Sequence, residues 1–94
     1  MAGEKILQTK ILGDLRAMPE VVAFKVEKTS DNGVPDIFFC SLRSGAIFLE
    51  VKDVGKKPKP HQQAMINRLN AAGVKAFYVD SIEGWIRLRS LLFN

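Results

Sequence analysis

The chain has 94 residues, of which 47% are hydrophobic and 26% are charged. That length suits one compact domain over residues 1–94, and the hydrophobic fraction excludes a disordered tail. A single cysteine excludes a secreted scaffold held by internal disulfides. No apolar run approaches the roughly 18 residues of a membrane span, and the first residues lack the apolar core of a signal peptide. We therefore expect a soluble, cytoplasmic protein.

The formal net charge is +4, and three lysines in one short segment account for most of it. This segment, residues 54–60, is called the lysine loop below and carries Lys56, Lys57 and Lys59 without an acid. One interpretation is a solvated surface loop, which is the usual meaning of a short charge run. The other is a loop that contacts nucleic-acid phosphates. His61, the next residue, has the same two interpretations.

The first half of the chain predicts a helix and three strands. Apolar residues spaced by three and four predict an amphipathic helix over residues 4–17, which Pro19 ends. β-Branched residues predict a strand over residues 21–28, followed by a turn. The next strand begins at Asp36, because Pro35 cannot lie inside a strand ladder. A hairpin-like turn then leads to a third strand over residues 46–53.

The second half predicts a helix, a strand and a final helix. An apolar stripe predicts a helix over residues 62–72, with Gly73 at its C-terminal end. The continuous apolar stretch within residues 74–79 is typical of a buried parallel strand. Residues 82–93 form the last predicted helix, in which we expect Trp85 to belong to the core or to a subunit contact. The order αβββαβα predicts an α/β fold with a mixed sheet flanked by helices.

The third strand carries the residues that could bind a metal ion or take part in catalysis. One of its faces is wholly apolar, and the opposite face carries Phe48, Glu50 and Lys52. A bare Glu-x-Lys is most often part of an ordinary half-exposed strand. Asp36, however, begins the neighbouring strand and could place its carboxylate beside Glu50. Two close carboxylates repel unless a cation lies between them, and a few oxygen ligands with open positions suit Mg²⁺ or Mn²⁺.

The spacing of these residues resembles a known pattern. Gly33-Val34-Pro35-Asp36, followed fourteen residues after the aspartate by Glu50-Val51-Lys52, is similar to the signature of the PD-(D/E)xK nuclease superfamily. Within that superfamily the chain resembles the virus-type replication-repair nuclease (VRR-NUC) domain. The resemblance covers nearly the whole chain and implies a restriction-endonuclease-like core.

The resemblance also implies roles for the motif residues. It implies that Asp36, Glu50 and the backbone carbonyl of Val51 bind the metal, and that Lys52 orients or activates the attacking water. Such a metal would polarise a phosphodiester oxygen and lower the pKa of a bound water.

Two further motif positions complete the pattern. Glu4, in the first helix, would complete the acidic cluster directly or through water; its alternative role is that of an acid favoured by the helix dipole. Gln62 would anchor the site by hydrogen bonding, although the adjacent Gln63 leaves the register open by one residue. Gly33 and Pro35 would serve as scaffold that aims Asp36.

The implied function is a Mg²⁺- or Mn²⁺-dependent DNA endonuclease that leaves 5′-phosphate and 3′-hydroxyl ends. Small stand-alone members of the family resemble Holliday junction resolvases, which act as homodimers, and two symmetric cuts in a four-way junction need two copies of a chain this small. A flap, nicking or restriction-type endonuclease and a non-catalytic nucleic-acid-binding module remain alternatives. The family's setting leads us to expect a bacterial or phage-infected host cell.

Overall fold

The computed structural model describes residues 2–94, and it confirms the order αβββαβα. The elements are α1 (Ala2–Arg16), β1 (Val22–Lys25), β2 (Ile37–Ser41), β3 (Gly45–Val51), α2 (Pro60–Ala71), β4 (Lys75–Val79) and α3 (Ile82–Phe93). Within residues 2–94, none of the helices combines the length and the apolar character that crossing a membrane requires.

The four strands form one mixed sheet in the order β1-β2-β3-β4. The β1–β2 and β2–β3 pairs are antiparallel, and β3 and β4 are parallel. A parallel pair needs a crossover connection, which the lysine loop and α2 provide. As a result the carboxyl ends of β3 and β4 meet at the same edge, where the backbone N–H of Lys52 donates to the carbonyl oxygen of Val79 at 2.9 Å.

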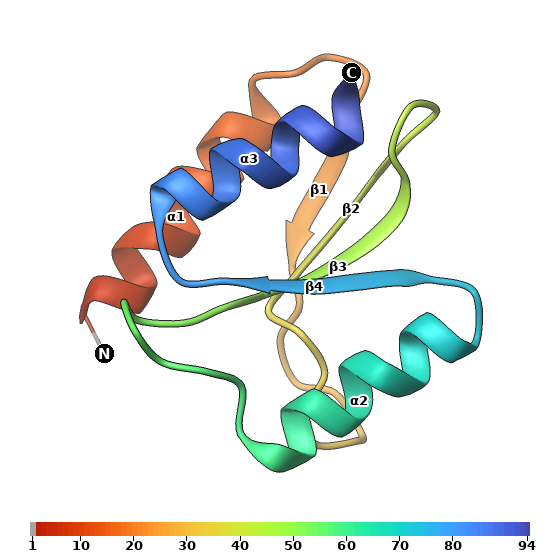
Figure 1. Ribbon diagram of the computed structural model, residues 1–94. Coiled ribbons are helices and arrows are strands. Elements are labelled where there is room, and N and C mark those ends of the chain that lie inside the picture. Colours follow the sequence, from red (N-terminus) through yellow and green to blue (C-terminus); the bar gives the residue numbers. More distant parts are fainter. Residues whose placement is uncertain (1) are drawn as a thin grey trace.

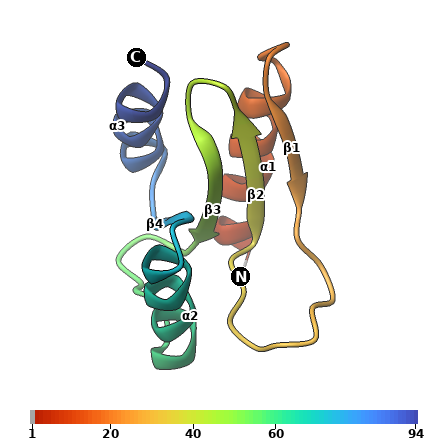
Figure 2. The same ribbon diagram turned by 90° about the vertical axis from the view of Figure 1, so that its right-hand side faces the viewer.

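Helices cover the two faces of the sheet unequally. Figures 1 and 2 show α1 and α3 together on one face, while α2 lies on the other face beside β4. The apolar face of β3 packs into the core under α1, and Ile47, Leu49 and Val51 are fully buried there, as the alternation predicts. Trp85 is also fully buried, and its indole N–H donates to the Asp14 carboxylate at 2.7 Å. The expectation that this tryptophan belongs to the core is confirmed.

The face opposite α1 carries a row of three phenylalanines. Phe24, Phe38 and Phe48 lie across β1, β2 and β3, with successive ring centroids 5.2 and 5.1 Å apart. Phe48, on the same strand face as Glu50, therefore has aromatic neighbours. Packing within this row explains a phenylalanine beside a polar site.

The sequence-based boundaries are off by one to three residues: β3 ends at Val51 rather than at residue 53, so that Lys52 lies just beyond the strand, and α2 begins at Pro60 rather than at residue 62. β1 ends at Lys25 rather than at residue 28, because β2 begins only at Ile37 and Lys28 adopts a left-handed backbone with φ of 47°. The expectation of a buried parallel fourth strand is confirmed for its parallel pairing with β3 and is wrong for its burial, since Tyr78 is 38% exposed. β4 is an edge strand, so one side of it has no neighbouring strand to cover it.

Candidate active site

Asp36 and Glu50 meet where β2 begins and β3 ends. Ile37 pairs with Leu49 in the antiparallel ladder, and the same register places Asp36 opposite Glu50. The Asp36 carboxylate accepts a hydrogen bond from the backbone N–H of Val51 at 2.9 Å. Asp36 is thereby fixed against the strand that carries Glu50. The structure thus brings together the two carboxylates that are fourteen residues apart in the sequence.

Glu50 is a buried carboxyl group beside other acids. Glu50 is only 2% exposed. Burial, followed by the neighbouring Asp36 carboxylate, raises the pKa of Glu50 to about 8; Lys52 acts in the opposite direction and Glu4 adds a smaller upward effect. The Asp36 and Glu50 carboxyl groups are close enough to share a hydrogen bond when one is protonated. A cation bound between the two carboxylates would relieve the same repulsion that the proton relieves.

Lys52 and Gln62 form the second half of the candidate site, beside the Asp36–Glu50 pair. Lys52 is only 9% exposed, and its ammonium donates to the side-chain oxygen of Gln62 at 3.2 Å. The same oxygen accepts the backbone N–H of Lys59 at 2.8 Å, which caps the start of α2. The side chain of Gln63 instead donates to Asn67 on the exposed side of the helix. The hydrogen bonds therefore select Gln62 as the residue of the pair that contacts Lys52.

The Gly-x-Pro-Asp loop packs directly against the first turn of α2. Gly33 has a φ of 83°, and a Cβ at this position would lie 2.6 Å from the carbonyl oxygen of His61 and 3.2 Å from Cα of Gln62. Only glycine suits both the backbone conformation and the close approach. Pro35, which is fully buried, then leads into Asp36. The loop therefore fixes the distance between the carboxylate pair and Gln62. His61 has an exposed side chain in this turn, and its contact with phosphate stays a prediction.

A hollow of about 600 Å³ gathers most of the remaining candidates. It is lined by Glu4, Lys52, Asp53, Lys56, Lys57, Lys59 and Gln62. All three lysines of the lysine loop thus share one cavity with the buried lysine and with the acid of the first helix. Lys56, Lys57 and Lys59 are exposed as well, so both the solvated and the phosphate-contacting interpretation of the loop stay predictions.

The chemistry of the donor set fits a small, hard cation. Among residues 2–94, no three His, Cys, Asp or Glu side chains are grouped so that they could hold a metal ion by themselves. Glu4 lies near enough to Glu50 to raise its pKa and borders the same hollow as Lys52, so its role, directly or through water, stays a prediction. The protein ligands would be Asp36, Glu50 and the carbonyl oxygen of Val51, and the remaining positions would be open to water and phosphate.

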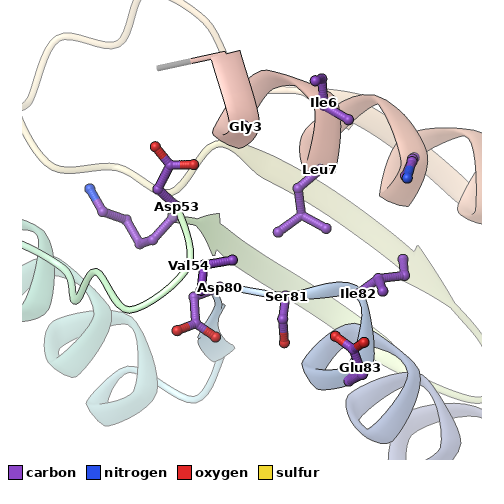
Figure 3. A pocket seen from close by; sticks show the side chains of 11 residues that line it. Gly3, Ile6, Leu7, Asp53, Val54, Asp80, Ser81, Ile82 and Glu83 are labelled. Atoms are coloured by element: carbon purple, nitrogen blue, oxygen red, sulfur yellow. The ribbon is translucent and has the colours of Figure 1, made fainter.

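Two aspartates that sequence reasoning missed support this edge of the sheet. Asp80 directly follows β4, and its carboxylate accepts the backbone N–H of Gly55 at 3.0 Å, which ties the lysine loop to the sheet. Asp53 directly follows Lys52 and lies against the first turn of α1 (Figure 3). Both residues border a second hollow, of about 260 Å³, between α1 and the start of α3. No local signal in the sequence singles them out, because it is the parallel pairing of β3 with β4 that brings the ends of these strands together.

Comparisons with known proteins find solved structures that match nearly the whole chain. No family model matches the sequence, and no curated protein matches it. Among solved structures, one described as a "VRR_NUC domain" superposes with a TM-score of 0.83 at 27% identity, over 94% of this chain and 95% of that chain. A second, a "VRR_NUC domain protein", has a TM-score of 0.76 at 16% identity over 95% of this chain and 86% of that chain. The resemblance seen in the motifs is thereby confirmed. The sheet and its helices form a restriction-endonuclease-like α/β fold, and these matches support a VRR-NUC domain, that is, a nuclease domain of the PD-(D/E)xK type.

Proposed function

We propose that this chain is a Mg²⁺- or Mn²⁺-dependent DNA endonuclease that hydrolyses phosphodiesters in branched DNA, and that it acts as a homodimeric Holliday junction resolvase. One observation carries the proposal. The Asp36–Glu50 pair lies beside Lys52, whose ammonium is held by Gln62 at the mouth of a hollow lined by three further lysines. A protein that merely bound DNA would gain nothing from a buried glutamate paired with a half-buried aspartate facing a polyanion.

Each residue has a defined part in hydrolysis. The lysines of the lysine loop hold the phosphates that flank the scissile one, contacts that position DNA without reading its sequence. A divalent cation bound by Asp36 and Glu50 would polarise the scissile phosphate and lower the pKa of a water. Lys52, oriented by Gln62, holds the attacking water and offsets negative charge on the phosphate oxygens. The water oxygen bonds to phosphorus and the bond from phosphorus to the 3′ oxygen breaks. A proton reaches that 3′ oxygen, which leaves 5′-phosphate and 3′-hydroxyl ends.

The proposed dimer follows from the size of the chain and the symmetry of the substrate. A four-way junction is resolved by two symmetric cuts, and one site on a domain with principal extents of 33 × 31 × 23 Å cannot make both together. Two copies related by a two-fold axis present two equivalent sites. Light scattering at micromolar concentration should therefore give twice the mass of one chain.

Cleavage of defined substrates tests the proposal. The protein is incubated with a synthetic four-way junction, a 5′ flap and a linear duplex, each with Mg²⁺, Mn²⁺ or EDTA. We expect metal-dependent cleavage that prefers the junction and is abolished by Asp36→Ala, Glu50→Ala or Lys52→Ala, while DNA binding is retained. The matched control is Gln63→Ala, which removes the adjacent side chain, whose amide donates to Asn67 instead of contacting Lys52.

Each other outcome has a definite meaning. Preference for the flap or the duplex would replace the resolvase with a flap or restriction-type endonuclease. DNA binding without cleavage in any metal would support a non-catalytic module. Full activity of Glu50→Ala would refute the assigned site.

A further inference from the structure

The two glycines of α1 have different surroundings. A Cβ built on Gly13 meets nothing within 4 Å, whereas a Cβ built on Gly3 would overlap a carboxylate oxygen of Asp53. Glycine is a poor helix former, so its presence near a helix start calls for a local reason. Figure 3 shows the Asp53 carboxylate directed toward the first turn of α1, beside Gly3. The missing side chain of Gly3 therefore permits the direct approach of helix and carboxylate.

Asp53 is held on both sides by backbone hydrogen bonds. The preceding N–H, of Lys52, donates to Val79 at 2.9 Å, and the carbonyl oxygen of Asp53 accepts the N–H of Lys56 at 2.9 Å. The carboxylate thus projects from a fixed point at the end of β3. The first N–H groups of any helix lack partners within the helix, and an adjacent negative charge is favourable there.

The described part of the first turn of α1 lies outside the buried core. The buried apolar stripe of the helix begins only at Leu7, while Ile6 is 56% exposed. Residues before Leu7 therefore depend on contacts other than the core. Asp53 is the neighbour from outside α1 that the structure places at Gly3.

The contact also separates the two hollows of this edge. Asp53 and Lys52 line both hollows, whereas Gly3 borders the smaller one and Glu4 borders the larger one with the lysine loop. A displacement of the first turn would therefore move Glu4 relative to Lys52.

We propose that Asp53 is a positioning residue: its carboxylate fills the space that Gly3 leaves empty, holds the first turn of α1 against the end of β3, and so sets where Glu4 stands in the larger hollow. The part that concerns Glu4 rests on the proposed nuclease function. The part that concerns the helix turn does not depend on activity.

Amide hydrogen exchange of the metal-free protein tests the contact itself. The amides of residues 6–8 donate to carbonyls of the first turn, so their exchange reports whether that turn is formed. We expect Gly3→Ala and Asp53→Ala to accelerate their exchange by about tenfold or more. The matched control Gly13→Ala makes the same chemical change in the same helix and should leave these amides unchanged. Alanine favours helix formation and the Asp53 carboxylate can rotate away from a Cβ at residue 3, so Asp53→Ala is the deciding variant, and unchanged or slower exchange in it would overturn the contact.

Cleavage kinetics test the link to Glu4. Gly3→Ala should slow junction cleavage by about tenfold in the wild-type background and by less than about twofold in a Glu4→Ala background, because both changes then act on one group. Equal effects in the two backgrounds, or a wild-type rate with an opened first turn, would overturn the link. If the wild-type protein cleaves no DNA with any metal, the proposed function fails, and the exchange measurement still decides whether Asp53 holds the helix.

Discussion

Replacing Glu50 with glutamine should make the metal-free protein more stable at alkaline pH while it removes activity. In the folded chain the pKa of Glu50 is raised to about 8, against 4.5 as its ordinary value. The folded state therefore binds the proton more tightly than the unfolded state between these two values. The contribution of this group to stability is fully present below pH 4.5 and is lost as the pH rises through 8.

The structure sets the size of the effect. At about 1.4 kcal/mol for each pKa unit, full ionisation of Glu50 costs the fold about 5 kcal/mol by pH 9. That figure is an upper bound, because water entering the site would relieve part of it. Glutamine has nearly the same shape and no charge to bury. We expect the advantage of Glu50→Gln over the wild type to grow by at least about 2 kcal/mol between pH 5 and pH 9.

Urea denaturation in EDTA at pH 5, 7 and 9 provides the measurement. Trp85 is the single tryptophan and is fully buried, so its fluorescence reports unfolding of the core. The control is Glu27→Gln, the same chemical change at an exposed site, which should follow the wild type at every pH. If the free energies of unfolding of the wild type and Glu50→Gln changed equally with pH, the raised pKa of Glu50 would be refuted. In a separate titration without EDTA, Mn²⁺ should stabilise the wild type at pH 7 and leave Glu50→Gln nearly unaffected.

Three further predictions follow from the contacts around the site. Gln62→Ala removes the hydrogen bonds that hold the Lys52 ammonium and cap α2, so it should lower the cleavage rate by about tenfold or more. Gln63→Ala should leave the rate unchanged, and equal losses in the two variants would reject Gln62 as the motif glutamine. Gly33→Ala combines a left-handed φ with a clash at His61 and should destabilise the protein by about 2 kcal/mol in urea titrations; wild-type stability would contradict it. Neutralising all three lysines of the lysine loop should make the slope of log K for junction binding against log salt concentration shallower by about 3. An unchanged slope would mean that the loop is a solvated surface loop.

The element order was predictable because its signals are local. The i, i+4 apolar spacing of α1 and the strict alternation of β3 depend only on which side of each element faces the core. Pro35 and Pro19 mark boundaries that a proline imposes in any context. The end of β1 was not predictable in this way, because residues 26–28 have strand-like composition but no partner on β2.

The pairing of the site residues needed more than spacing. The sequence places Asp36 and Glu50 fourteen residues apart, which is compatible with many geometries. The strand register decides that they lie opposite each other, and burial decides that the pKa of Glu50 rises. The choice between Gln62 and Gln63 likewise depended on which side of α2 faces Lys52.

The sequence by itself determined the fold class, the seven elements and the chemical types of the site, because periodicity and residue chemistry are properties of the chain. Only the tertiary structure revealed Asp53 and Asp80 as parts of the same edge, and only it placed the lysine loop around a common hollow with Lys52. The physical reason is the parallel pairing of β3 with β4. That pairing brings together two strand ends that are separated by the lysine loop and all of α2, and no local pattern in the sequence encodes that meeting.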